Sequence, residues 1–192
     1  REAAFAEEDV SFVDSKVMWQ DVEADKVILC QGAYGLQGID GYQGWFSHVH
    51  HRSAKGEILN VWIDELDEAR RYHCNGWLAP REGGMWKAGA NYDWKHMDAI
   101  PTDEGKSEVL KKLNTWVELG AGKEVPMEVI GHEAGIRPIV RNSMPVVGFH
   151  PEMKEVGFFN GLGSKGSLMA PAVAEHFASY LNGECELDEE LT

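Results

Sequence analysis

The sequence predicts a mixed α/β or α+β fold, in which antiparallel and mixed sheets are covered by helices. Short alternating apolar segments come first, and an aromatic-rich meander with tight glycine turns follows them. The chain then ends in a strand, a glycine loop and a helix. Its 192 residues, 43% of them hydrophobic, supply enough apolar surface for one sizeable core or for two lobes that share a sheet system.

The first predicted elements are two or three short strands over residues 10–31. The last apolar run, Lys26–Cys30, is followed two residues later by Gly32. A compact run of this kind suits a strand that is buried on both faces, in the parallel part of an α/β sheet. Residues 32–45 follow as a glycine-rich loop with a short helical turn.

Residues 48–92 have the pattern of an antiparallel meander. We expect a long strand over His48–Ile63, a second over Tyr72–Pro80 and a third over Met85–Tyr92. The segment Arg81–Gly84 predicts a hairpin between the last two, because its glycines adopt the positive φ that a tight turn requires.

Residues 103–119 predict the clearest internal helix. Thr102 is a suitable N-cap, and two acidic residues follow it at the positive end of the helix dipole. One apolar stripe runs along it through Val109, Leu110, Leu113 and Val117. Two more strands, Met127–Val140 and Val156–Phe159, and a last helix over Gly166–Leu181 complete the expected elements.

The charge of the chain bears on its partners. Formal net charge is −14, from 18 Lys+Arg against 32 Asp+Glu, so we expect no nucleic acid partner. Apolar runs stay short of the ~20 residues that span a bilayer, which predicts no membrane partner. Three scattered cysteines and an acidic N-terminus without a hydrophobic signal core predict a cytoplasmic protein with reduced thiols. A first residue of Arg1 suggests that the chain begins inside a longer reading frame.

The stretch V-G-F-F-N-G-L-G-S-K-G-S-L-M-A-P, residues 156–171, carries the strongest chemical signal. A hydrophobic strand leads through Gly161, Gly163 and Gly166 directly into a helix. Glycines let a ligand lie against the backbone, and the N–H groups at the helix start attract anionic oxygens or an electron-rich ring edge. Close packing of strand on helix is the alternative explanation for these glycines.

Together with the segment A-G-I-R-P-I-V-R-N-S-M-P-V-V-G-F-H-P-E (residues 134–152), this stretch resembles the C-terminal signature of the glycine oxidase and D-amino-acid oxidase (DAO) family of flavoenzymes. Four further segments resemble the family in the same order: V-I-L-C-Q-G-A-Y, A-K-G-E-I-L, W-L-A-P-R-E-G-G and K-A-G-A-N-Y. The resemblance covers residues 26–182 and implies an FAD-dependent oxidation of a small amine or amino acid by hydride transfer to the flavin.

The resemblance also implies roles for individual residues. Gly32 and Ala33 would lie beside the cofactor on the nucleotide-domain side. Arg137 would grip a substrate carboxylate with its guanidinium fork, unless it is a structural arginine tied to a carbonyl or an acid. Gly135 stands near the position where some members carry a flavin-linking cysteine, so FAD would be non-covalent. The residues expected to approach the flavin ring are Gly161, Gly163, Ser164, Lys165 and Gly166.

Other side chains are weaker candidates. Tyr72, His73 and Tyr92 could line a substrate pocket, although aromatic residues on strands more often belong to a core. His48 and His50 could share one strand face, but no acidic or cysteine partner has metal-ligand spacing, so no metal site is expected.

The sequence lacks the N-terminal strand–glycine-turn–helix of a dinucleotide-binding domain. Residues 161–166 match Gly-x-Gly-x-x-Gly, yet no second strand or acidic residue follows, so we interpret them as the loop facing the reactive ring. Residues 1–46 and 136–192 are then parts of an incomplete FAD-binding domain of Rossmann type. Residues 47–135 form a substrate-binding antiparallel-sheet lobe. The missing N-terminal FAD-binding half would lie on a longer chain or on another one, and the isolated chain would be inactive. The alternative function is a non-catalytic ligand-binding or protein-interaction module derived from the same fold.

Overall fold

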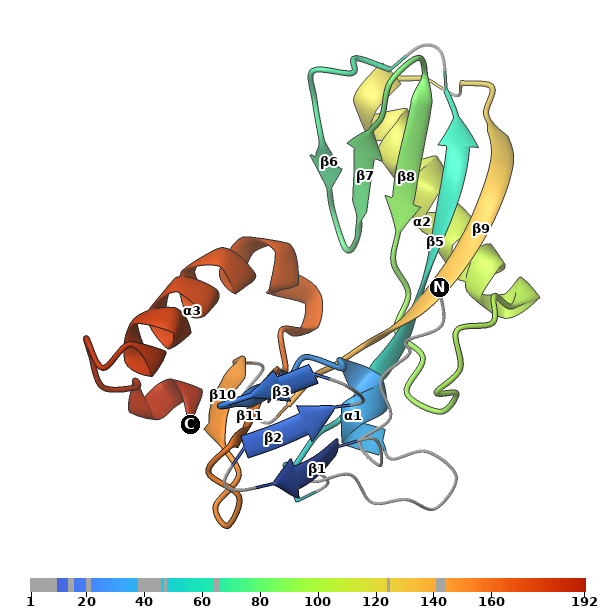
Figure 1. Ribbon diagram of the computed structural model, residues 1–192. Coiled ribbons are helices and arrows are strands. Elements are labelled where there is room, and N and C mark those ends of the chain that lie inside the picture. The colour runs from blue at the N-terminus through green and yellow to red at the C-terminus, as the bar shows by residue number, and fades with distance from the viewer. Residues whose placement is uncertain are drawn as a thin grey trace. The chain divides into compact units, whose positions relative to one another are not determined.

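The computed structural model of the protein describes residues 10–13, 16–19, 22–37, 46, 48–63, 66–123, 125–140 and 144–192. These residues form two compact units. The first contains the described residues up to Ser53 together with Arg137–Thr192, and the second is Ala54–Ile136. Figure 1 shows the strands and helices of both. The predicted mixed α/β class, with antiparallel and mixed sheets and covering helices, is confirmed.

The first unit begins with an antiparallel sheet of short strands, as the alternation over residues 10–31 predicts. It contains β1 (Val10–Val13), β2 (Lys16–Trp19) and β3 (Val22–Ala24) in that order. The next strand, β4 (Val27–Leu29), belongs to a different sheet, and the short helix α1 (Ala33–Gln37) follows it.

The second sheet of this unit has the order β10 (Val146–Phe149), β11 (Val156–Asn160) and β4 among the described strands. β11 pairs with β4 in parallel and with β10 in antiparallel fashion, so the expected parallel strand at Lys26–Cys30 is confirmed. The expected burial on both faces is partial: Leu29 is buried, whereas Val27 and Ile28 are half-buried and pack against different apolar clusters of this sheet. The sequence did not predict β10 as a strand.

Apolar side chains cover both faces of this sheet. One cluster contains Leu29, Leu36, Phe46, Val140, Val156 and Phe158. The other contains Val147, Val173, Phe177 and Leu191. The second cluster holds α3 (Gly166–Leu181) against the sheet, with the bounds that the sequence predicts for the last helix. The 3-10 turn η3 (Gly163–Lys165) directly precedes α3. A second 3-10 turn, η4 (Glu189–Leu191), lies near the C-terminus.

The second unit is a sheet with the order β6 (Tyr72–His73), β7 (Trp77–Pro80), β8 (Met85–Gly89), β5 (Ala54–Trp62) and β9 (Glu128–Arg137). The last residue of β9 reaches the first unit. The hairpin at residues 81–84 is confirmed: Gly83 and Gly84 have φ of 68° and 78° there, and the Arg81 N–H donates to the Met85 carbonyl at 2.7 Å.

Two predicted strands differ from those observed. The strand expected over His48–Ile63 begins only at Ala54, because His51 pairs with Val140 and the Arg52 N–H donates to the Ile139 carbonyl at 2.7 Å. These contacts also place the start of the second unit at Ala54 rather than at residue 47. The strand expected over Tyr72–Pro80 is a hairpin of β6 and β7, with Asn75 at a φ of 50° in its turn.

Helix α2 (Asp103–Ala121) covers one face of the second unit's sheet, as Figure 1 shows. Thr102 caps it as predicted, because its Oγ1 accepts a hydrogen bond from the Gly105 N–H at 3.1 Å. The core beneath the helix contains Leu59, Val61, Leu78, Trp86, Val109, Leu113, Trp116 and Val117. Among the described helices of the chain, none has the length and apolar character needed to span a bilayer.

Candidate functional site

The carboxyl ends of β4 and β11 lie at one edge of the first unit's sheet, because these two strands run parallel in register. Ligands of open α/β sheets bind outside such ends. Gly32 and Ala33 follow β4, and residues 161–166 follow β11. The first unit thus brings together two of the three segments predicted to form a site.

A buried side chain connects these two segments. Asn160, the last residue of β11, is 2% exposed. Its Nδ2 donates a hydrogen bond to the Gly32 carbonyl at 2.8 Å, and its Oδ1 accepts one from the Gly161 N–H at 2.8 Å. The turns after β4 and β11 are therefore held to one another by a single amide.

The third predicted segment joins the same site through its backbone. The Gly163 N–H donates to the Pro138 carbonyl at 2.9 Å, and Ile139 forms a β-bridge with Leu162. Arg137, which is half-buried, directly precedes Pro138. The candidate arginine is thus one residue from a backbone contact with the glycine loop.

The loop glycines differ in what surrounds them. Gly161 has a φ of +79°, and a Cβ there would lie 2.6 Å from Val140 Cγ2, so both conformation and packing require glycine. Gly163 has a φ of +54°, and the nearest atom to a Cβ would be Ile139 Cγ1 at 3.7 Å. Gly161 is therefore a packing position, whereas a Cβ at Gly163 would make only ordinary van der Waals contacts, with Ile139 and the Pro138 carbonyl.

The start of α3 is electrostatically positive. Its N-cap residue is Lys165, no side chain caps it by a hydrogen bond, and its first turn has no acidic residue. Ser164 and Lys165 are exposed. Because the first N–H groups of a helix attract negative charge, this end suits an anionic or electron-rich group.

The candidate residues of the second unit lie in different surroundings. Tyr72 packs on the core, with its ring 6.1 Å from that of Trp86. His73 is exposed in β6, opposite Trp77 of β7. Tyr92 is 48% exposed and stacks on Trp94, with ring centroids 5.7 Å apart. Tyr72 is thus occupied in packing, whereas His73 and Tyr92 are accessible on the surface of this unit.

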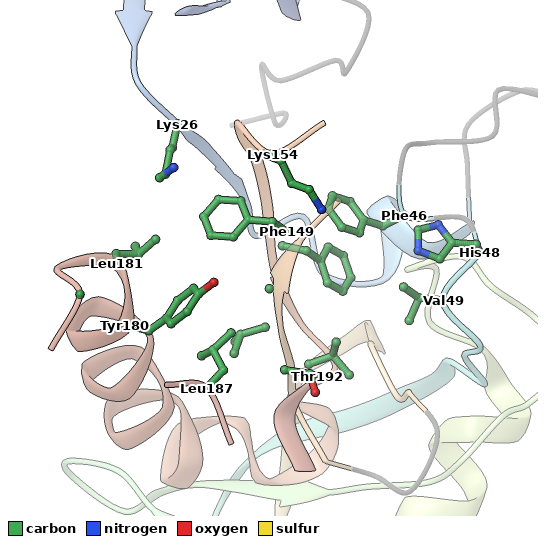
Figure 2. Close-up of a pocket in the computed structure, with 15 residues that line it drawn as sticks. Lys26, Phe46, His48, Val49, Phe149, Lys154, Tyr180, Leu181, Leu187 and Thr192 are labelled. Carbon is green, nitrogen blue, oxygen red and sulfur yellow. The ribbon is translucent and has the colours of Figure 1, made fainter. Parts of the chain in front are cut away.

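A cavity of about 740 Å³ lies elsewhere in the first unit. Figure 2 shows Phe149 and Tyr180 beside it, and the Lys26 Nζ lies 5.0 Å from the centre of the Phe149 ring. None of residues 161–166 lines this cavity, so it is separate from the glycine loop.

The described residues can also be compared with the requirements of a metal site and of a reactive thiol. Within the described ranges, no three His, Cys, Asp or Glu side chains gather as a metal site would require. Partial burial raises the pKa of the Cys30 thiol above its ordinary value, which disfavours the reactive thiolate at neutral pH.

Asn160 is the site residue that the sequence analysis missed. A polar residue ending the apolar strand V-G-F-F-N was the available signal, since a buried amide must find hydrogen-bond partners. Its partner Gly32 is 128 positions away, so local patterns do not reveal the contact.

The chain is similar to a known family, to individual relatives and to a solved structure. Residues 3–180 match the model of a family described as FAD dependent oxidoreductase (DAO). The chain is 32% identical over 155 residues to a glycine oxidase of Bacillus subtilis (strain 168), covering 79% of the chain and 40% of that protein. It is 30% identical over 134 residues to the tRNA 5-methylaminomethyl-2-thiouridine biosynthesis bifunctional protein MnmC of Marinobacter nauticus, covering 66% of the chain and 21% of that protein.

A solved glycine oxidase structure from Geobacillus kaustophilus shares the fold, with a TM-score of 0.74 and 18% identity. The superposition covers 96% of the chain and 50% of that structure. The chain thus spans half or less of the length of these relatives. The family match extends over most of the 192 residues, and the glycine loop lies within it. The chain therefore belongs to the family of FAD-dependent oxidoreductases known as DAO.

Proposed function

We propose that the chain forms the flavin-facing and substrate-side half of an FAD-dependent oxidoreductase that oxidises a small amine or amino acid. One observation carries the proposal: the segments after β4, after β9 and after β11 are tied together by backbone and Asn160 hydrogen bonds. Three members of that cluster, Gly32, Gly161 and Gly163, are residues that the family resemblance assigns to the cofactor, and Arg137 directly precedes a fourth member, Pro138. A nucleotide-binding half would complete the pocket, since the chain spans only 40% of the Bacillus subtilis glycine oxidase.

The proposed cofactor contacts fit an electron-rich ring edge. A Cβ at Gly163 would meet no close contact, and no side chain caps the start of α3 at Lys165. Gly32, Ala33, Ser164 and Gly166 would complete the contact. When bound, FAD supplies the acceptor of a hydride from the substrate carbon that bears the amine. Position 135, near which some family members carry a flavin-linking cysteine, is a glycine without a side chain to bond the flavin, so we propose non-covalent binding.

Arg137 is the proposed substrate anchor. Its guanidinium group would bind a carboxylate in bidentate fashion, which fixes both the position and the plane of an amino-acid substrate. Among the candidates of the second unit, His73 and Tyr92 are exposed and Tyr72 is the least accessible, so we propose His73 and Tyr92 ahead of Tyr72 as substrate-binding residues.

A small-molecule substrate is favoured over RNA. One relative carries tRNA biosynthesis in its name, but the present chain has a formal net charge of −14. Affinity for nucleic acid depends mainly on lysine and arginine contacts to phosphates. An acidic protein repels the phosphates. We therefore propose the glycine, sarcosine or D-amino-acid type of substrate.

The visible absorption spectrum tests the proposal. The full-length protein, purified and mixed with FAD, should retain yellow colour after desalting, with bleaching on anaerobic addition of an amine substrate. A protein that stays colourless would support the non-catalytic module instead. The 192-residue chain alone serves as the control, and we expect it to retain no FAD because its sequence lacks the strand–glycine-turn–helix motif that binds a pyrophosphate.

A further inference from the structure

The side chain of Asn160 has two hydrogen-bonding ends, and both are used at the turns that form the proposed flavin site. The Nδ2 donor meets the Gly32 carbonyl and the Oδ1 acceptor meets the Gly161 N–H, each at 2.8 Å. Both partners are glycines in the left-handed region, with φ of +62° and +79°. The side chain that joins them is almost completely buried.

The two partners belong to segments that nothing local connects. β4 and β11 pair from Val27–Val156 to Leu29–Phe158, and the described ladder between them ends there. Asn160 extends the connection past the end of that ladder, at the carboxyl edge of the sheet. An apolar side chain at this position would leave the buried Gly161 N–H without the bond that Asn160 provides.

The arrangement also decides which amides of the loop point inward. The Gly161 N–H is directed to Asn160, and the Gly163 N–H to the Pro138 carbonyl. The Gly161 and Gly163 amides are therefore already bonded within the protein, so amide hydrogen bonds from this loop to a bound ring would come from its other residues, toward α3. A loop without the Asn160 bonds could turn its first amides outward and lose this arrangement.

We propose that Asn160 is a positioning residue that holds residues 161–166 in their ligand-binding conformation before the cofactor binds. The inference rests on the proposed function. The inference goes beyond the proposed function because it assigns the preorganisation of the loop to one buried side chain, that of Asn160.

Amide hydrogen exchange of the full-length protein without FAD tests the preorganisation directly. In the wild type, we expect the Gly161 amide to exchange at least a hundredfold more slowly than an unprotected amide, and FAD to change that rate less than threefold. An unprotected Gly161 amide in the FAD-free protein would overturn the proposal. This measurement needs no variant and no bound cofactor.

Two variants separate the two hydrogen bonds. Asn160→Ala removes both, and we expect exchange over residues 161–166 to accelerate at least tenfold and the FAD dissociation constant to rise at least tenfold. Asn160→Asp keeps an acceptor for the Gly161 N–H and removes the donor to Gly32, so loop exchange should stay closer to that of the wild type. Asn182→Ala, at the exposed C-cap of α3, is the matched control.

A merely structural role has a different signature. Asn160→Ala would then lower the melting temperature while its FAD dissociation constant, measured well below that temperature, equalled that of Asn182→Ala; this result would overturn the proposal. If the wild type bound no FAD, the proposed function would fail. The exchange rates alone would then test the positioning role. Slow exchange of residues 161–166 in the wild type with fast exchange in Asn160→Ala would support it, and equal rates in the two proteins would refute it.

Discussion

The carboxylate of Glu57 lies 2.7 Å from the Nε2 atom of His132, in the interior of the second unit. The Glu57 side chain is fully buried, and it also accepts hydrogen bonds from the Thr102 N–H at 2.9 Å and from the Thr102 Oγ1 at 2.8 Å. His132 Nε2 forms an ion-pair contact but no aligned hydrogen bond. One carboxylate therefore connects β5, β9 and the N-terminus of α2, where a negative charge is favourable.

Replacing Glu57 by glutamine should destabilise the protein strongly. The variant keeps the shape of the side chain but removes the charge beside His132 and the helix start. Glutamine offers only one acceptor oxygen to the two Thr102 donors, and a buried donor left unsatisfied costs about 1–3 kcal/mol. Urea unfolding measures the loss, and Glu118→Gln on the exposed side of α2 is the control. Equal unfolding midpoints for the two variants would show that the Glu57 charge is dispensable.

Gly105→Ala should also destabilise the protein, against the usual helix preference. Alanine in place of glycine normally favours a helix by about 1 kcal/mol. Here, a Cβ on Gly105 would overlap the Glu57 carboxylate, so the carboxylate must move from its partners. We expect a net loss of about 1–3 kcal/mol, as for other overpacked positions. Gly135→Ala, where a Cβ would meet no atom within 4 Å, is the matched control and should change the unfolding free energy by less than about 0.5 kcal/mol.

Local signals explain why some elements were predicted well and others were not. The Thr102 cap, the acidic first turn and the apolar stripe lie within 16 positions of each other, so α2 could be predicted almost to its ends. The strand expected over His48–Ile63 is shorter, because His51 pairs with Val140 and Arg52 bonds to Ile139, which separates residues 48–53 from β5. Asn160 depends on a carbonyl 128 positions away. Long-range partners therefore account for the boundary errors and for the missed site residue.

Acid should weaken the second unit through Asp93. The Lys95 N–H and then the His96 side chain donate to its carboxylate and lower its pKa from 3.8 to about 2. Because this pKa is lower in the folded than in the unfolded chain, the carboxylate stabilises the fold above about pH 4, and the stabilisation is lost as pH falls toward 2.

Asp93→Asn should therefore melt below the wild type at pH 5, and the gap should close progressively between about pH 4 and pH 2. Thermal unfolding followed by circular dichroism across this range measures the gap. Glu82→Gln, at an exposed position of the β7–β8 turn, is the control. A gap that stays constant down to pH 2 would mean that the Asp93 charge does not contribute.

Arg137→Leu should separate substrate binding from cofactor binding in the full-length protein. If the guanidinium group holds a substrate carboxylate, its loss removes two charge-assisted hydrogen bonds, or about 3 kcal/mol, and raises the Michaelis constant for an amino acid about a hundredfold. The FAD dissociation constant should change less than about threefold, because Arg137 is not among the proposed cofactor contacts. Arg137→Lys keeps the charge without the planar fork, so its Michaelis constant should lie between those of the wild type and Arg137→Leu. Arg81→Leu, exposed in the β7–β8 turn, controls for the loss of an arginine. Comparable losses in FAD and substrate affinity would instead identify Arg137 as a structural residue, which its adjacency to Pro138 and the glycine loop would then explain.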